Sequence, residues 1–475
     1  MVKSTRQKTE VTESQAIING LAHDGGLYIF SSFPKIKLNN ILDMDYKSIS
    51  IKILSLLLKD YTENEIREAV MCAYDSKFDT QEIVKVKEFD NCAILELFHG
   101  PTLAFKDMAL TILPELLKIA KRKNKVSKDT IILTATSGDT GGATLSGFAN
   151  VLGMKVVVFY PNNGVSEIQE KQMLSFKSKT AHVIAFNGNF DDTQNLVKDK
   201  FKEYPYLSSA NSINIGRLAP QVIYYFYAYK KMVNDKKIKL GEEINICVPT
   251  GNFGNILGAY IAYLMGLPVN KFICASNKNK VLTDFFETGI YNKNREFYKT
   301  NSPSMDILIS SNLERLLYLF GADCTKLMND LKNTGQYEVN DEIKEKMKKF
   351  VSGYSNDSET LDTIKEVYQT NNYLLDPHTA VAYKVFKDEN CKEKTLIVST
   401  ASPFKFPDAV TSALGVTANS LDEKIQAISK ASNVTIPKQI FEYKMNEKEV
   451  WNKEDTNVNF CKLMEELKYD KYSEN

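Results

Sequence analysis

Lys106 stands in an unusual setting for a lysine. It follows the largely apolar stretch "FHGPTLAF" (residues 98–105), and a helix-like run begins directly after it. A lysine held away from water loses its proton more readily, and the neutral amine is a nucleophile that can form a Schiff base with an aldehyde. The alternative is a surface lysine whose stem lies along apolar neighbours while its head stays in water. The other motifs must decide between these interpretations.

The loop "GNFGN" (residues 251–255) has the composition of a phosphate site built from the backbone. Gly and Asn tolerate the turn conformations that leave N–H groups exposed, and such groups at the start of a helix bind phosphate without a basic side chain. A plain strand-to-helix turn is the alternative. The loop matches neither a Walker A loop nor G-x-G-x-x-G, so an ATP-binding enzyme is disfavoured. Candidate ligands of the phosphate are Gly251, Asn252, Phe253, Gly254 and Asn255.

A second loop, "TSGDTGG" (residues 136–142), also follows a predicted strand and opens a helix. The hydroxyls of Thr136, Ser137 and Thr140, together with the loop N–H groups, suit a small carboxylate or a phosphate. Asp139 complicates that interpretation, because a carboxylate repels an anion. It must cap the helix, point elsewhere or accept a hydrogen bond from the ligand. The alternative is a helix cap followed by a glycine turn.

Thr400 places a hydroxyl at the end of the last predicted strand. A Schiff-base lysine, a phosphate nest and a hydroxyl at one crevice together describe a pyridoxal phosphate site. An aspartate beside the pyridine nitrogen would keep that nitrogen protonated, whereas a threonine hydroxyl only hydrogen-bonds a neutral ring. The carbanion is then less delocalised, which suits eliminations and replacements better than transamination.

These motifs need elements that bring them together, and the chain alternates short β-branched runs with amphipathic ones. The runs that predict strands are residues 130–137, 155–161, 181–188, 244–250, 271–277 and 394–400. Strands alternating with helices form parallel sheets covered on both faces. We therefore expect an α/β fold with two doubly wound parallel-sheet subdomains and an N-terminal subdomain. Ligands of such sheets bind outside the carboxyl ends of the strands, where the three polar loops fall.

The 475 residues are more than one core usually covers, so several subdomains are expected. The expected parts are an N-terminal subdomain (1–90), a large cofactor-binding domain (91–129 and 206–420, with a helical insertion at 280–375), a small mobile α/β domain (130–205) and a charged C-terminal tail (421–475).

The composition bounds the partners and the compartment. A formal charge of +1 argues against a nucleic-acid or anionic-membrane partner. The seven cysteines form no C-x-x-C pair and the four histidines are scattered, so we predict no metal site and a reducing compartment. No secretory signal is evident, and the uncharged window 244–270 is interrupted by Pro and Gly. We expect a cytoplasmic protein, and no obligate protein partner is evident.

Eight blocks, in order along the chain, resemble the threonine synthases of the longer bacterial and fungal type. They are "DGGLYI" (24–29), "FHGPTLAFKD" (98–107), "TATSGDTGGAT" (134–144), "SANSINIGRLAPQ" (209–221), "PTGNFGNILGAY" (249–260), "SNLERLL" (311–317), "DPHTAVAY" (376–383) and "STASPFKF" (399–406). The resemblance implies a fold type II pyridoxal phosphate enzyme, similar to the tryptophan synthase β subunit. Related dehydratases and cysteine synthases share the loops but not "HGPTLAFKD" or "NSINIGRL".

The resemblance also implies roles for individual residues. Lys106 would carry the cofactor and move protons, residues 251–255 would hold the cofactor phosphate, and Thr400 would face the pyridine nitrogen. The substrate carboxylate would lie at Ser137, Asp139 and Thr140, and the substrate phosphate at Ser212, Asn214 and Arg217, with Lys405 a further candidate. Arginine suits a bidentate phosphate contact. The chain departs from the family's "AHPAKF", because Ser402 replaces the histidine and Phe404 the alanine.

The implied activity is that of a carbon–oxygen lyase at the last step of threonine biosynthesis. It converts O-phospho-L-homoserine and water into L-threonine and phosphate, and the 130–205 domain would move to close the crevice. The nearest alternative is a pyridoxal-phosphate-dependent threonine/serine dehydratase or a phospho-amino-acid lyase of the same fold. A catalytically idle homologue retained for binding or regulation is the alternative from another class.

Overall fold

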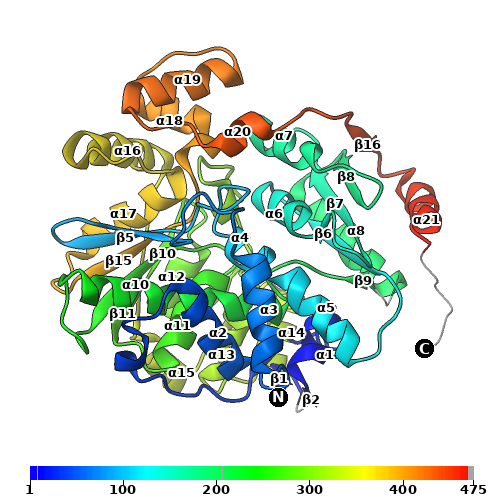
Figure 1. The fold of residues 1–475 in the computed structure, drawn as a ribbon, viewed down its shortest axis with the longest axis horizontal. Coiled ribbons are helices and arrows are strands. Elements are labelled where there is room, and N and C mark those ends of the chain that lie inside the picture. The colour runs from blue at the N-terminus through cyan, green and yellow to red at the C-terminus, as the bar shows by residue number, and fades with distance from the viewer. Residues whose placement is uncertain (8, 205–206, 469–475) are drawn as a thin grey trace.

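The computed structural model describes residues 1–7, 9–204 and 207–468, and two open sheets dominate it (Figure 1). The larger has six strands in the order β14-β11-β10-β15-β5-β4. Their bounds are β14 Phe350–Tyr354, β11 Val269–Ser276, β10 Ile244–Pro249, β15 Thr395–Ser399, β5 Cys92–Glu96 and β4 Lys85–Glu88. All neighbours are parallel except β4, which runs antiparallel to β5. β10, β15 and β5 are buried throughout, as expected for a parallel sheet covered on both faces.

The smaller sheet has five parallel strands in the order β16-β8-β7-β6-β9. They are β16 Glu449–Trp451, β8 Ala181–Phe186, β7 Met154–Pro161, β6 Thr130–Ala135 and β9 Leu207–Ser208, and the crossover helices are α6 Asp139–Phe148, α7 Glu167–Ser175 and α8 Phe190–Glu203. Side chains of a strand alternate between faces. Accordingly Ile132 packs into the main core, while Ile131 and Leu133 pack into a second cluster with Trp451 and Phe460. The predicted fold of two doubly wound sheets is confirmed.

The N-terminal region forms a three-stranded sheet and helices that pack into the main core. Its elements are β1 Val2–Ser4, β2 Glu10–Val11, β3 Tyr28–Phe30, α1 Glu13–Asn19, α2 Tyr46–Leu57 and α3 Glu63–Ala73. Capping boxes at Thr12 and Thr62 start α1 and α3 by satisfying free N–H groups. β4 falls within the range 1–90 but is an edge strand of the large sheet.

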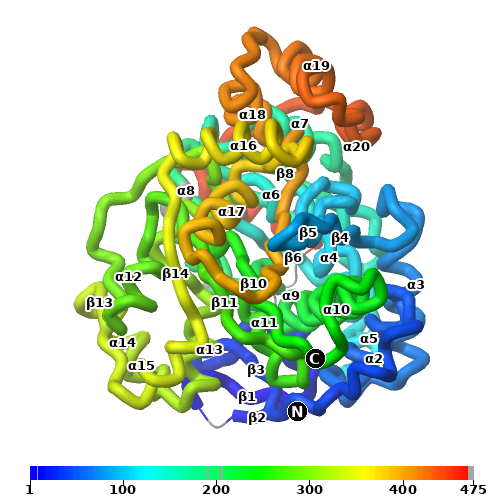
Figure 2. The backbone as a smooth tube through the Cα atoms, turned by 90° about the vertical axis from the view of Figure 1, so that its left-hand side faces the viewer, coloured from blue at the N-terminus to red at the C-terminus, as the bar shows by residue number. Residues whose placement is uncertain are grey.

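The segment expected as a helical insertion, 280–375, is mostly helical. It contains α12 Val281–Thr288, α13 Leu313–Leu319, α14 Cys324–Thr334, α15 Asp341–Met347 and α16 Asp357–Asn371, with the antiparallel pair β12 Ile290–Asn292 and β13 Gln336–Glu338. It also supplies β14, the outer parallel strand of the large sheet. This strand is short and follows a lysine-rich run, so its sequence gives little sign of it. Figure 2 shows α16, α18 Pro407–Leu414 and α19 Leu421–Ser432 at the end of the molecule opposite the N-terminal sheet.

The C-terminal residues, expected as a charged tail, contain packed elements. α20 Lys438–Glu442, β16 and α21 Thr456–Glu466 run from beside α7 to the outer edge of the small sheet (Figure 1). Apolar residues spaced among the lysines and glutamates are buried, including Ile425, Ile428, Trp451 and Phe460.

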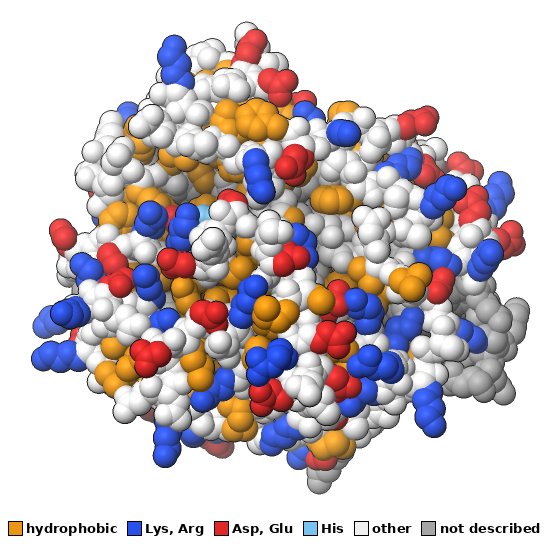
Figure 3. Space-filling model, viewed as in Figure 1, with side chains coloured by type: hydrophobic (Ala, Val, Ile, Leu, Met, Phe, Trp, Pro, Cys, Tyr) orange, Lys and Arg blue, Asp and Glu red, His pale blue; other side chains and the backbone are white. Residues whose placement is uncertain are grey.

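The uncharged window 244–270 is a strand, a loop and a helix, as predicted: β10 is followed by α11 Gly254–Leu264. Within the described ranges, none of the helices combines the length and apolar character that a membrane crossing needs. Acidic and basic side chains are interspersed on the face shown in Figure 3, in keeping with the near-zero formal charge.

Candidate active site

Lys106 precedes α4 (Asp107–Leu110), and the turn before it is fixed to the end of β15. Phe105 N–H donates to the Thr400 carbonyl over 2.8 Å, and Ala104 forms an isolated bridge with Ala401. Lys106 and Thr400 therefore lie at the carboxyl end of one strand. Both line a cavity of about 2340 Å³ between the two sheets.

Asp139, the first residue of α6, is the partner of Lys106. The Lys106 Nζ lies 3.6 Å from Asp139 Oδ2 and 4.9 Å from the centre of the Phe105 ring. Burial lowers the pKa of the Lys106 ammonium; the Asp139 carboxylate opposes this, and the cations of Lys405 and Arg217 reinforce it. Lys106 is thus a buried amine that gives up its proton more readily than a surface lysine, as the sequence predicts.

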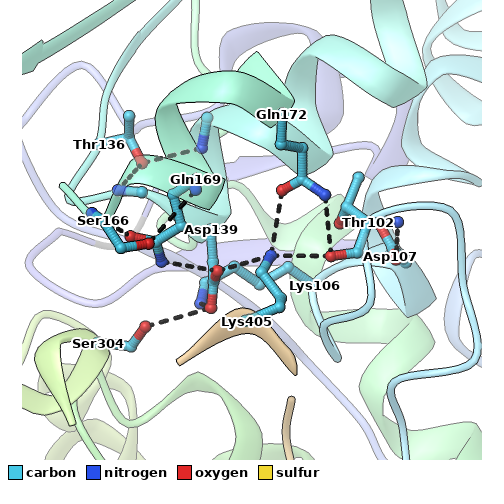
Figure 4. Close-up of polar contacts among 12 residues, drawn as sticks. Thr102, Lys106, Asp107, Thr136, Asp139, Ser166, Gln169, Gln172, Ser304 and Lys405 are labelled. Carbon is cyan, nitrogen blue, oxygen red and sulfur yellow. Dashed lines mark hydrogen bonds and ion pairs between the residues drawn. The ribbon is translucent and has the colours of Figure 1, made fainter. Parts of the chain in front are cut away.

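Asp139 points away from the cavity. Its Oδ1 accepts from Lys405 Nζ at 2.8 Å and Gln169 Nε2 at 3.0 Å, and Ser304 donates to Oδ2 over 3.4 Å (Figure 4). Burial alone would favour the neutral acid, but the ammonium groups of Lys405 and Lys106 outweigh it and hold the pKa of Asp139 far below its usual range. Of the three options for Asp139, the structure shows that it points elsewhere, and its absence from the cavity lining corrects its assignment to the substrate carboxylate.

Lys405, a candidate for the substrate phosphate, also lies behind the cavity wall. It is 1% exposed, and besides Asp139 its Nζ donates to the Thr102 carbonyl at 2.8 Å and to Gln172 Oε1 at 3.1 Å. Figure 4 shows it between Asp139 and Gln172. An ammonium with three acceptors and no access to the cavity cannot hold a substrate phosphate, so this prediction is corrected.

Three hydroxyl-bearing residues of the loop 136–142 line the cavity, namely Thr136, Ser137 and Thr140. Thr136 is engaged within the loop, because its Oγ1 accepts from the N–H groups of Gly138 and Gly141 at 3.0 and 2.9 Å. Ser137 and Thr140 are half-buried and line the cavity at the start of α6.

The loop 251–255 presents the N-terminus of α11 to the same cavity. Phe253 holds a left-handed conformation, with φ of 63°, and its ring stacks on Phe286. A Cβ on Gly251 would lie 2.7 Å from the Ser304 carbonyl oxygen, so this position requires glycine. The side-chain Nδ2 of Asn255 is buried and has no hydrogen-bond partner among the described residues.

Two further elements hold this loop in place. Ser310 donates to the Gly251 carbonyl over 2.7 Å, and the Asn312 side chain donates to the Asn252 carbonyl over 2.8 Å. Asn312 also donates to the Ser212 hydroxyl at 3.1 Å, which places Ser212 beside the loop and on the cavity wall. The block "SNLERLL" therefore supports both anion-binding candidates.

Arg217 lies in α9 (Ile215–Leu218) and lines the cavity although it is 3% exposed. Its Nη1 donates to the Ala210 carbonyl at 2.6 Å, while its Nε has no partner among the described residues. Burial lowers the pKa of Arg217 to about 10, so the guanidinium stays charged at neutral pH. A buried guanidinium with unused donors fits an anionic group.

Asn214 is not at the cavity, which corrects its predicted phosphate contact. Its Oδ1 caps α9 by accepting from Gly216 N–H at 2.9 Å, and its Nδ2 donates to the carbonyls of Ile17 and Ser209. The side chain is fully engaged in positioning the helix that carries Arg217.

Ser402, where the family has histidine, is a buried cap. Its Oγ accepts from Phe404 N–H over 3.4 Å at the start of a short 3₁₀ turn, Pro403–Lys405.

Among the described residues, no side chain hydrogen-bonds the Thr400 hydroxyl, which leaves that hydroxyl available at the cavity.

His378 is a cavity residue to which sequence reasoning gave no role. Its Nε2 accepts from Ser304 N–H at 3.2 Å, and its Nδ1 lies 3.0 Å from Asp376 Oδ1. These contacts fix the backbone of Ser304, against which Gly251 packs. His378 lies in the block "DPHTAVAY", which resembles the family, but nothing in that block indicates that the histidine contacts Ser304.

Three family models match segments of this chain. Residues 90–402 match a family model described as "Pyridoxal-phosphate dependent enzyme", residues 2–74 one described as "Threonine synthase N terminus" and residues 379–438 "Threonine synthase, C-terminal". The threonine synthase of Schizosaccharomyces pombe is 36% identical, over 84% of this chain and 86% of its own length.

The chain belongs to the threonine synthase family.

Within that family, the crystal structure of pyridoxal-phosphate-bound threonine synthase from Brucella melitensis matches 97% of this chain and 98% of its own, with a TM-score of 0.85 and 33% identity. Threonine synthase-like 1 of Macaca fascicularis is 39% identical over 85% of this chain. The chain spans 58% of the length of that relative.

The residues at the cavity fit pyridoxal phosphate, the cofactor of this family. Lys106 supplies an amine of lowered pKa, the N-terminus of α11 has N–H groups without intrahelical acceptors, and Asn255 adds an unpaired buried amide. Together they provide the amine and the anion site that an aldehyde with a phosphate needs.

Proposed function

We propose that this protein is a threonine synthase that converts O-phospho-L-homoserine and water into L-threonine and phosphate. One observation carries the proposal: the Lys106 amine and the partly unpaired Arg217 guanidinium open into the same cavity, which lies between two sheets. The first is the group that moves protons, and the second suits a substrate that carries a phosphate. The family membership supports the same reaction.

The proposed cofactor ligands are Lys106, the loop 251–255 and Thr400. When bound, pyridoxal phosphate withdraws electrons from the carbon next to the substrate amino group, so that protons at this carbon and the next can be removed. The α11 N-terminus would hold the cofactor phosphate with its backbone N–H groups, and the Thr400 hydroxyl would hydrogen-bond the pyridine nitrogen. A threonine hydroxyl, unlike an aspartate, would not keep that nitrogen protonated, which favours elimination and replacement.

The proposed substrate ligands lie on two sides of Lys106. Ser137 and Thr140, with the α6 N-terminus behind them, bind the carboxylate through hydroxyl and N–H donors. Arg217 binds the substrate phosphate with its free donors, and Ser212 adds a hydroxyl. An arginine that stays charged throughout also stabilises the phosphate as it leaves.

Lys106 accepts and returns the protons. Its burial lowers its pKa, so the neutral amine that a general base requires forms more readily than at a surface lysine. Asp139 lies 3.6 Å away and stabilises the ammonium form once the proton has been taken. We also propose that the unit formed by β6, β7 and β8 closes over the substrate, because the cavity is lined from both sheets and closure would exclude water.

The test is product formation by the purified protein supplied with pyridoxal phosphate. We expect threonine and phosphate to appear in equal amounts from O-phospho-L-homoserine. Serine and threonine serve as comparison substrates. Turnover of serine at an equal rate would reject the proposal in favour of a dehydratase.

A phospho-amino-acid lyase is the second candidate. Arg217, with its unpaired Nε at the cavity, would bind a substrate phosphate equally well in a lyase. Such an enzyme would release phosphate and ammonia and leave a keto acid. Phosphate released without threonine in the same assay identifies it.

A cytoplasmic location belongs to the proposal. The seven cysteines are all free in the structure, which suits a reducing compartment. Localisation of the tagged full-length protein by microscopy tests this.

A further inference from the structure

Tyr443, in the segment after α20, touches the turn that carries Lys106. Its hydroxyl donates to the Pro101 carbonyl over 3.4 Å, and Gln439 one turn earlier donates to the Gly100 carbonyl over 3.3 Å. Tyr443 is largely buried, and burial raises the pKa of its hydroxyl, so it remains a neutral donor and acceptor.

Gln172 connects Tyr443 to the ion pair behind Lys106. Its Nε2 donates to the Tyr443 hydroxyl and, over 3.2 Å, to the Thr102 carbonyl, while its Oε1 accepts from Lys405 at 3.1 Å. These contacts fix the orientation of the amide, because a flipped amide would place its NH₂ against the Lys405 ammonium and its oxygen against a carbonyl. The acceptor on Tyr443 therefore helps to keep the correct side of Gln172 turned toward Lys405.

The segment that carries Tyr443 lies outside the matched family models, the last of which ends at residue 438. It is tied to α7 at two more points: Asn446 donates to the Leu174 carbonyl over 2.8 Å, and Lys448 pairs with Glu170 at 2.6 Å. α7 also carries Gln169 and Gln172, the two residues that contact Asp139 and Lys405. The segment is thus positioned to fix this helix against the site.

We propose that Tyr443 is a positioning residue for Lys106: it fixes Gln172, which holds Lys405 against Asp139. The proposal rests on the proposed function only in its account of why the charge on Lys106 matters. Three charged groups act on Lys106, namely Asp139, Lys405 and Arg217. If Lys405 moves away from Asp139, a repelling cation is lost and the carboxylate is less neutralised. Both changes stabilise the ammonium form of Lys106.

The test compares the full-length protein with its Tyr443→Phe variant without added cofactor. An amine-acylating reagent is applied across a pH series, and labelling of the Lys106 peptide is measured by mass spectrometry. The rate follows the fraction of neutral amine, so we expect the variant's midpoint to move to higher pH and its rate below the midpoint to fall by about threefold or more. An unchanged midpoint would overturn the proposal.

Two further variants separate positioning from loss of packing. Tyr61→Phe is the matched control, because it also removes a buried hydroxyl that donates to a carbonyl, that of Leu116 at 3.1 Å, away from this network. It should leave the Lys106 midpoint unchanged. In a Lys405→Met background, Tyr443→Phe should have no further effect on labelling, since linked residues are not additive. If Tyr443→Phe shifted the labelling midpoint of Lys106 by the same amount in the Lys405→Met background, Tyr443 would not act through Lys405.

Steady-state kinetics keep the two proposals distinguishable. Tyr443→Phe should lower kcat at pH values below the midpoint and leave KM for the substrate close to that of the parent. A parent protein that makes no threonine rejects the proposed function, whereas the labelling result still decides the role of Tyr443.

Discussion

Lys405 and Asp139 form a buried ion pair, with 2.8 Å between Nζ and Oδ1 and side chains that are 2% and 3% exposed. The other oxygen of the same carboxylate faces Lys106 at 3.6 Å. One carboxylate therefore serves two ammonium groups, of which only Lys106 reaches the cavity. When Lys106 loses its charge, Asp139 keeps a cationic partner and stays ionised.

Replacing Asp139 by Asn should destabilise the fold, because Lys405 would remain buried without a counter-charge. We expect a loss of about 3–5 kcal/mol in the free energy of unfolding at pH 7, measured by urea denaturation. The pKa of Asp139 is depressed in the folded state, so its contribution is fully present above the unfolded pKa of about 3.9 and declines as pH falls below it. The difference in the free energy of unfolding between variant and parent should therefore become smaller at acid pH. A difference in the free energy of unfolding that stays constant down to pH 3 would contradict a depressed pKa for Asp139.

Lys106→Arg should abolish turnover while preserving the fold. Arginine keeps the positive charge beside Asp139 but cannot give up its proton in a protein. We expect threonine formation to fall by roughly 10²–10⁴-fold or more. Circular dichroism of the variant checks that it folds as the parent does. Residual activity within tenfold of the parent would exclude Lys106 as the proton-transferring group.

Arg217→Lys should weaken substrate binding and leave the cofactor bound. A lysine cannot reproduce the forked donors of arginine, and the loss of charged hydrogen bonds should raise KM for O-phospho-L-homoserine by roughly 10- to 100-fold. The matched control is Arg122→Lys, because the Arg122 side chain is 63% exposed and is not part of the cavity lining. Cofactor absorbance should be unchanged in both. Equal KM values in the two variants would refute a phosphate contact for Arg217.

Gly251→Ala should weaken the cofactor site with little effect on the rest of the fold. The added Cβ would lie 2.7 Å from the Ser304 carbonyl, and since backbone cannot rotate away, the loop 251–255 must shift. We expect affinity for pyridoxal phosphate to fall by at least roughly tenfold, equivalent to about 1.4 kcal/mol, as measured by fluorescence titration. Gly415→Ala is the comparison: its φ of 67° makes the substitution strain the backbone, but a Cβ there would have no neighbour within 4 Å. Equal cofactor affinity in the two variants would contradict the role of this close approach.

The fold and the cavity-facing groups could be predicted because their signals are local. The strand–helix alternation fixes two parallel sheets, and a parallel sheet gathers its loops at one edge, so Lys106, the loop 251–255 and Thr400 meet as expected. β14 and β16 were not predicted, because each is short and surrounded by charged residues. What makes them strands is a partner edge far away in the sequence.

The misassigned residues share a different cause. Lys405, Asn214 and Asp139 have the right chemistry for an anion site and lie in the right motifs, but their side chains point behind the wall. The direction of each side chain depends on the helix that packs against it. That helix is α7 for Lys405 and Asp139, and α1 for Asn214. No pattern within a motif encodes that choice.

The pairing of β16 with β8 bears on how the protein is made. A ribosome synthesises β8 long before residues 449–451, so throughout that interval the nascent small sheet has an open edge with unpaired N–H and C=O groups. Another polypeptide could add a strand there during translation. Completion of the sheet thus waits for a late part of the chain, and nonsense mutations that remove this part would be expected to yield aggregation-prone products even when every cavity-lining loop has been translated.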